Sequence, residues 1–202
     1  MQPHFSKGAC DSIAFVFSCP GEKEELAGHP AAGVTGRNLE RLLPLLAHHL
    51  GQSALTRIEV TIANAWKDIE YRGLTGRSEA TDAEIRLPRN MQRLAAQVQH
   101  VTELIVFCGD KAWIAAQELR VNHLLSERPK FAFSGHLGTL GLNRIICDIE
   151  GNLIRNAKEQ RRAGSLTPLR EIRSDNTLRQ LNVVAASLAA SIASMPAASK
   201  YQ

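Results

Sequence analysis

The chain has 202 residues, the length of one ordinary domain. Hydrophobic residues make up 44% and charged residues 22% of it, which excludes a disordered tail protein, a collagen and a coiled coil. The net charge is +4, and the basic surplus lies in residues 152–202, which carry eight Lys and Arg against three Asp and Glu. This uneven charge favours an anionic partner such as nucleic acid, although a solvated basic face would give the same pattern.

Short apolar runs alternate with helical patterns along the chain. Strands are predicted at residues 12–18, 57–62, 103–108 and 130–134. Helices are predicted at residues 36–49, 88–99 and 183–199, with another that begins at residue 111. Thr81 and Glu84 have the spacing of a capping box, and Pro88 suits the first turn of the helix that follows. Asp110 is expected to cap the helix that begins at Lys111.

This alternation predicts an α/β fold with a central four-stranded parallel sheet and helices on both faces. Residues 1–195 are expected to form one domain, and residues 196–202 a frayed tail rich in Ala and Ser. Ligands bind to such sheets at the carboxyl ends of the strands. The predicted ends are residues 18–21, 63–68, 108–110 and 134–138.

The cysteines give no sign of a metal site or a disulfide framework. Cys10, Cys19, Cys108 and Cys147 are scattered and form no C-x-x-C pair. The apolar run before Cys19 is too short for a signal peptide, and residues 183–199 are too few and too polar for a membrane span. We therefore expect a cytoplasmic monomer with no membrane association, no metal cluster and no cofactor.

A loop rich in Gly and Pro, residues 20–36, links the first predicted strand to the first long helix. Such a loop lets the backbone approach a ligand closely before a helix begins. It contains neither the G-K-[ST] of a P-loop nor the G-x-G-x-x-G of a dinucleotide site. The loop therefore predicts a ligand site of another kind.

This loop resembles the first motif of the uracil-DNA glycosylase superfamily, most closely its iron-sulphur branch, where P-G and an acidic run precede G-x-P-x-x-G-x-x-G. The matching positions are Pro20, Gly21, Gly28, Pro30, Gly33 and Gly36. Three further segments agree with the family in the same order: residues 62–67 with its T-N-x-x-K, 105–112 with its strand and G-x-x-A, and 134–138 with its histidine loop. The resemblance covers about residues 12–146; its first motif is fairly specific, and each of the others is weak alone.

The resemblance implies a monofunctional DNA glycosylase, which flips a base out of DNA and hydrolyses its N-glycosidic bond to leave an abasic site. It assigns Asn64 to the Watson–Crick edge and His136 to the departing base. The loop from Pro20 to Glu25 would hold water and phosphate. Other implied contacts are Ala31, Pro20 and Gly21 with the base, and Gly33, Lys67, Gly135 and Arg144 with the DNA backbone. The charge of the basic segment from Arg155 to Arg173 predicts further phosphate contacts there, with Arg161 and Arg162 among them.

The chain departs from the family at the catalytic carboxylate, whose two known positions fall at Ser18 and Cys19. Water activation would then pass to Glu22, Glu25 or Asp68, or rely on His136 and electrostatics. Cys19 is either a reactive thiol at the mouth of the site or a small buried side chain. The sequence leaves these alternatives open.

Two further departures concern the pocket and the cluster. The aromatic that stacks on uracil falls at Ala31, which favours a modified or bulky pyrimidine as substrate. Asp68 stands where the iron-sulphur branch has a cysteine, and the proline after its histidine is Leu137 here. Removal of a base foreign to the host would serve as antiviral defence.

Other functions fit the same residues. One is uracil removal in DNA repair; another is a non-catalytic module that binds a damaged base; a third is a nucleotide-binding doubly wound domain. Asn64 is equally suited to cap a turn, and Trp66 and Trp113 to pack in the core. The acidic residues Glu22, Glu24 and Glu25 would ordinarily form a solvated loop.

Overall fold

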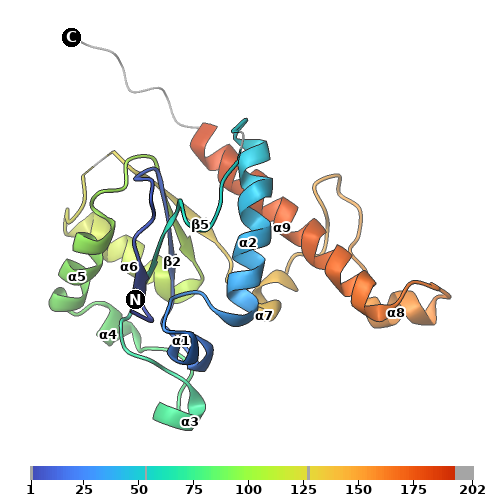
Figure 1. The fold of residues 1–202 in the computed structure, drawn as a ribbon, viewed down its shortest axis with the longest axis horizontal. Helices are drawn as coiled ribbons and strands as arrows, with labels where there is room; N and C mark the ends of the chain where they lie inside the picture. The colour runs from blue at the N-terminus through green and yellow to red at the C-terminus, as the bar shows by residue number, and fades with distance from the viewer. Residues whose placement is uncertain (1, 53, 127, 194–202) are drawn as a thin grey trace.

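The structure is a computed structural model that describes residues 2–52, 54–126 and 128–193. A five-stranded sheet with strand order β1-β3-β2-β4-β5 forms its centre (Figure 1). The strands are β1 (Phe5–Ser6), β2 (Ile13–Phe17), β3 (Thr61–Asn64), β4 (Leu104–Cys108) and β5 (Lys130–Ser134). The protein is thus an α/β fold, as predicted.

The prediction of a four-stranded, fully parallel sheet is wrong. Strands β2 to β5 are parallel, but β1 adds an antiparallel edge, with Phe5 opposite Ala63 and Ser6 opposite Ile62. This strand pairs the outer edge of β3, which would otherwise leave backbone groups unpaired. A strand of two residues is too short to give any periodic signal in the sequence.

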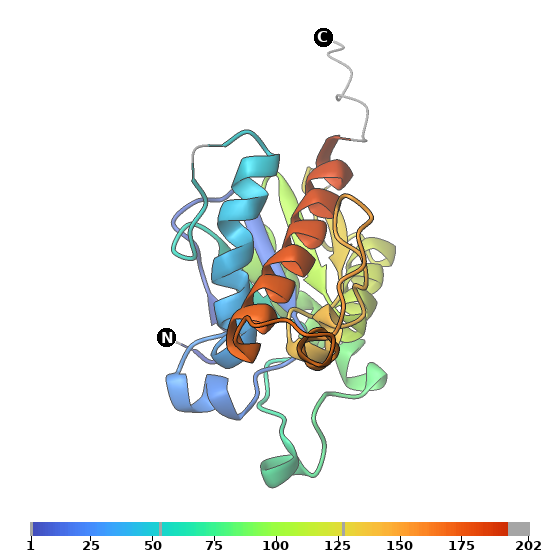
Figure 2. The same cartoon turned by 90° about the vertical axis from the view of Figure 1, so that its right-hand side faces the viewer.

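Helices cover both faces of the sheet (Figures 1 and 2). On one face, α2 (Gly33–His49) packs against α9 (Leu169–Ala193), and leucines of both helices join Phe15, Phe17 and Val106 of the strands in one apolar cluster. On the other face, α5 (Pro88–Val98) and α6 (Asp110–Val121) form a second cluster around Val16 and Phe107. Each face of the sheet therefore has its own buried core.

The short helices lie in the connections: α1 (Glu22–Ala27), α3 (Arg72–Thr75), α4 (Asp82–Ile85), α7 (Thr139–Leu142) and α8 (Ala157–Arg162). Helices α1, α3 and α7 lie toward the carboxyl ends of the parallel strands (Figure 1). The predicted capping box of Thr81 and Glu84 is confirmed, but it belongs to α4. Helix α5 begins separately at Pro88, as predicted.

Several boundaries differ from the prediction, including the start of α2, which is Gly33 and not residue 36. The strand predicted at 57–62 occupies Thr61–Asn64, because Glu59 accepts hydrogen bonds from Thr56 and makes residues 56–59 a turn. The N-cap of α6 is Gly109, so Asp110 is its first residue rather than its cap. Helix α9 begins at Leu169, well before residue 183. Its first turns extend beyond the sheet and pack beside α8 (Figure 1).

The predicted tail at 196–202, and the last residues of the helix predicted at 183–199, lie outside the described residues. Within the described ranges, no helix is both long and apolar enough to span a membrane.

Candidate functional site

The carboxyl ends of the strands bring three predicted or neighbouring side chains to one face of the sheet. Asn64 ends β3 directly opposite Phe17 of β2, so the two side chains point to the same face, that of α2. The ring of His136, just after β5, lies edge-on to Phe17 with 6.3 Å between the ring centroids. The fold thus positions Asn64 and His136 around Phe17, although 72 positions separate them in the chain.

The side-chain amide of Asn64 is buried without a hydrogen-bond partner for its oxygen. Only 1% of the residue is exposed, and Oδ1 contacts no donor in the part of the chain that the structure describes. The backbone of Asn64 is satisfied by the carbonyl of His4 and by the guanidinium of Arg93. An unpaired buried polar group costs about 1–3 kcal/mol, so the unpaired oxygen makes Asn64 a candidate ligand-binding residue.

His136 is held as a neutral donor. Its Nδ1 accepts a hydrogen bond from the backbone N–H of Gly138 at 2.9 Å, which places the ring proton on Nε2. Burial lowers the pKa of His136 below its ordinary value, against the opposing charges of Glu79 and Glu24. A Cβ at position 138 would lie 2.8 Å from Nδ1, which explains the glycine there. The nearby Asn38 fixes the same loop by donating to the carbonyl of Leu137 at 2.7 Å.

The acidic run after β2 is partly structural. Glu24 accepts from the backbone N–H of Gly21 at 3.0 Å and from that of Ala32 at 2.9 Å, so it braces the loop. Glu25 accepts from the hydroxyl of Tyr71 at 2.9 Å, and Glu22 is exposed. The sequence indicated Glu22 and Glu25 as candidate general bases, but it did not predict the structural role of Glu24.

Ala31 lies within the core rather than beside one of the described cavities. It is 3% exposed, packs in the same apolar cluster as Phe17 and Leu137, and has a left-handed backbone with φ of 47°. This conformation is rare for a residue with a side chain. The structure does not test the enlarged base pocket predicted at Ala31, which stays a prediction.

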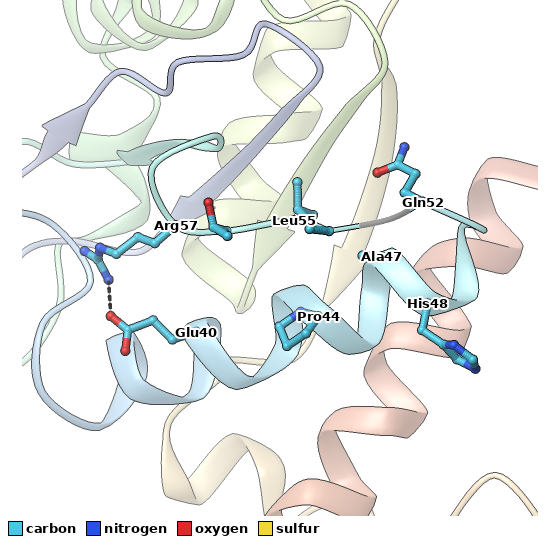
Figure 3. Close-up of a pocket in the computed structure, with 9 residues that line it drawn as sticks. Glu40, Pro44, Ala47, His48, Gln52, Leu55 and Arg57 are labelled. Carbon is cyan, nitrogen blue, oxygen red and sulfur yellow. Dashed lines mark ion pairs between the residues drawn. The ribbon is translucent and has the colours of Figure 1, made fainter.

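Arg57 holds the strained loop in place. Its guanidinium donates to the carbonyls of Pro30 and Ala31, at 2.5 and 2.9 Å, and lies 3.8 Å from the carboxylate of Glu40 (Figure 3). This ion pair closes one end of a cavity of about 460 Å³ that lies between α2 and residues 52 and 54–57. Arg57 gave no sequence signal, because its segment was predicted to be a strand.

The two residues at the family's carboxylate positions do not supply a base. Ser18 is buried, with its hydroxyl 3.9 Å from the sulfur of Cys19. Burial raises the pKa of the Cys19 thiol to about 11, so the thiol is protonated at neutral pH. The thiol donates instead to the carbonyl of Ser78 at 3.8 Å.

Alkylation tests this state of Cys19. At pH 8, iodoacetamide is expected to label the exposed Cys10 and Cys147 roughly 100-fold faster than Cys19, because only the thiolate reacts. Peptide mass spectrometry over time gives the rates. Labelling of Cys19 as fast as that of Cys10 would show a reactive thiol at this position.

The backbone on either side of Glu79 contacts Cys19. The carbonyl of Ser78 and the backbone N–H of Ala80 both bond to the Cys19 thiol, so Glu79 lies between two residues that contact it. The charge of Glu79 acts on the pKa of both Cys19 and His136. Sequence reasoning missed Glu79, since it lies about 60 positions from Cys19 and in no recognised motif.

An ion-pair network fixes the segment that carries Glu79. Arg77 bonds to the carboxylates of Glu70 and Glu84, and the pKa of Glu84 falls to about 2 mainly because of this bond. The backbone N–H of Glu70 donates to the carbonyl of Pro20 at 2.9 Å. The segment is thereby tied to the start of the loop that follows β2.

Lys67 lies on the other face of the sheet from His136. Its ammonium pairs with Asp68 at 2.5 Å, and both line a cavity of about 240 Å³ with Trp66 and Arg93 of the α5 side. Burial lowers the pKa of Arg93 to about 10, and its guanidinium bonds to the carbonyls of Asn64 and Ala65. The structure therefore does not join Lys67 or Asp68 to the His136 site.

The other predicted backbone contacts are dispersed. Gly33 begins α2 with φ of 62°, Gly135 is an exposed residue beside His136, and Arg144 is exposed just after α7. Arg161 and Arg162 are on α8, which projects away from the sheet (Figure 1). Their contacts with DNA stay predictions.

Across residues 2–52, 54–126 and 128–193, no group of three or more His, Cys, Asp or Glu is arranged to hold a metal ion. No protein-family model and no curated protein matches this chain.

Proposed function

We propose that the protein is a DNA glycosylase of the uracil-DNA glycosylase type, which acts on a base flipped out of DNA. The observation that carries the proposal is the buried amide of Asn64, whose oxygen has no partner among the described residues; Asn64 pairs in register with Phe17, the residue that His136 contacts edge-on. An amide offers a donor and an acceptor to the Watson–Crick edge of a base. A merely structural Asn at this position would have its oxygen paired.

His136 supports departure of the base. In the reaction, the oxygen of water bonds to C1′ of the sugar, the C1′–N bond breaks, and its electron pair leaves with the base, which then gains a proton. The neutral ring donates from Nε2 to the base as negative charge develops on it. The hydrogen bond from the backbone N–H of Gly138 to Nδ1 fixes the orientation of the His136 ring before the base binds. The ring therefore needs little reorganisation during the reaction.

Glu79 activates the water in this proposal. Glu79 follows Ser78, whose carbonyl accepts from the Cys19 thiol, and Cys19 stands at one of the carboxylate positions of the resembling family. A carboxylate there accepts a proton from the attacking water. Glu25 is the alternative base, although its carboxylate already accepts from Tyr71.

The preferred substrate is a modified or bulky pyrimidine, with defence against foreign DNA as the purpose; uracil repair is the alternative. A set of oligonucleotides that carry uracil or 5-substituted pyrimidines, in single and double strands, separates the two. The measurement is abasic sites, detected as alkali-labile breaks. Breaks at uracil alone would favour repair, whereas binding without breaks would favour the non-catalytic module.

Asn64 provides a separate test of base recognition. Asn64→Leu is expected to slow base release roughly 10-fold or more and to leave the free energy of unfolding nearly unchanged, because the amide oxygen has no partner to lose. Denaturant unfolding and single-turnover cleavage measure the two effects.

Asn90 is the matched control, since its amide donates to the carbonyls of Ala65 and Ile85 at 2.8 and 2.9 Å. Asn90→Leu is expected to lose about 1–3 kcal/mol of stability. If Asn64→Leu is destabilised as much as Asn90→Leu, the Asn64 amide is a structural group and the proposal loses its main support.

A further inference from the structure

A further cavity, of about 640 Å³, lies between α7, α8 and the N-terminal half of α9. Three cations line it: Arg155 before α8, Lys158 on α8 and Arg173 on α9. Amide side chains complete the polar wall: Asn143, Asn156, Asn176 and Gln180. No Asp or Glu is among the lining residues that the structure describes. The cavity is therefore cationic and rich in hydrogen-bonding groups.

The three cations of this cavity are exposed side chains without an ion-pair partner in the part of the chain that the structure describes. None of the ion pairs found in the described ranges includes Arg155, Lys158 or Arg173. The nearby acid Asp148 is held by Arg179, with 2.6 Å between Oδ2 and Nη2. Three positive side chains in one cavity repel one another, so an anion that binds among them gains favourable electrostatic energy.

The backbone around the cavity is fixed. The carbonyl of Arg155 accepts from the amides of Gln160 and Asn176, at 2.7 and 2.9 Å. The segment before Arg155 turns back on itself, with the N–H of Ile154 donating to the carbonyl of Ile146 at 2.7 Å. The cationic side chains thus extend from a rigid frame, which suits binding of a defined ligand.

Helix α7 links the cavity to the candidate site along the chain. Thr139 and Asn143, at the two ends of this helix, line the cavity, and α7 begins three residues after His136. A nucleic-acid strand whose base lies at His136 would therefore continue along this wall. Volumes of about 300–1,000 Å³ accommodate small organic ligands, so the cavity has room for more than a single phosphate group.

We propose that this cavity binds the phosphodiester backbone of the DNA strand beside the flipped nucleotide, through Arg155, Lys158 and Arg173. The inference rests on the proposed function. The sequence predicted phosphate contacts along the basic segment from Arg155 to Arg173, with Arg161 and Arg162 as its named contacts, and the cavity selects three other cations of that segment. Those two arginines do not line the cavity, and Arg161 donates instead to the carbonyl of Ser165 at 2.8 Å.

The test compares two double variants of equal charge. Arg155→Ala with Arg173→Ala removes two cavity cations, and Arg161→Ala with Arg162→Ala removes two cations outside it. The probe is a fluorescent 20-nucleotide DNA, single-stranded and as a duplex, titrated by anisotropy at several salt concentrations. An RNA of the same sequence is titrated in parallel. Circular dichroism checks that both variants are folded.

The cavity variant is expected to bind DNA at least 10-fold more weakly at 0.1 M salt, and the slope of log K against log salt is expected to fall by about 1.5–2. The Arg161 and Arg162 variant is expected to lose less than half as much. Equal losses in the two variants would indicate a diffuse basic surface and overturn the inference. An unchanged slope in the cavity variant, or tighter binding of RNA than of DNA, would do the same.

Base release in the same experiment separates this inference from the proposed function. One outcome is that the parent protein releases no base from any DNA while its affinity for DNA still depends on Arg155 and Arg173. This result would contradict the proposed reaction and support the proposed DNA-binding role of the cavity. If base release occurs and DNA affinity is insensitive to these residues, the reaction stands and the cavity fails.

Discussion

His136→Ala is expected to slow base release under single-turnover conditions by about 100- to 1,000-fold, the loss that follows removal of one strong donor to a developing anion. The enzyme is used at a saturating concentration, so that differences in DNA affinity do not change the measured rate. His48→Ala is the control, because His48 is an exposed residue of α2 that lies outside the proposed site. Equal rates for the parent protein and the His136 variant, at equal DNA affinity, would remove His136 from the mechanism.

The same variant has an expected effect on stability against pH. The pKa of His136 is lower in the folded protein than its ordinary value of 6.5. Between these two pKa values the unfolded chain therefore binds more protons than the folded protein. His136 therefore contributes stability above pH 6.5 that is lost as the pH falls through that value. The difference in unfolding free energy between pH 7 and pH 5 should be smaller in His136→Ala than in the parent protein. His4 and His100 titrate in the same direction in both proteins.

Glu79→Gln is expected to reduce single-turnover base release by about 100-fold, because a general base contributes at least this factor and glutamine cannot accept the proton. Glu25→Gln is measured beside it as the alternative base, and Glu103→Gln as an exposed control at the amino end of β4. DNA affinity should be unchanged or slightly higher for Glu79→Gln, since one negative charge is removed.

If Glu25→Gln loses most of its base-release activity and Glu79→Gln keeps full activity, the general base is Glu25 of α1. This result would contradict the role proposed for Glu79. Full activity in both would leave electrostatic stabilisation by His136 as the main catalytic effect.

The central strands are predictable because every residue in them is buried. Ile13–Phe17 and Leu104–Cys108 are apolar on both faces, and a sheet covered by helices on both sides requires this pattern. The strand near residue 60 was misplaced because its turn depends on a side-chain bond from Thr56 to Glu59 that apolar periodicity does not reveal. The edge strand Phe5–Ser6 forms only through its partner.

The candidate site was predictable in part. Asn64 and His136 were found from motif order, and the structure brings them to one face of the sheet around Phe17. The left-handed backbone of Ala31, the contact of Ser78 with Cys19 and the role of Arg57 depend on packing between distant segments. Sequence spacing carries no information on such contacts.

Direct detection of the released base tests the central claim. The protein is incubated with oligonucleotides that carry uracil or bulky 5-substituted pyrimidines, and with genomic DNAs that contain modified pyrimidines. Mass spectrometry quantifies free base, and an aldehyde-reactive probe quantifies abasic sites. The account predicts one free base for each abasic site with at least one substrate, and a loss of about 100-fold or more in the His136→Ala variant. Tight binding to DNA with neither free base nor abasic sites from any substrate would contradict it.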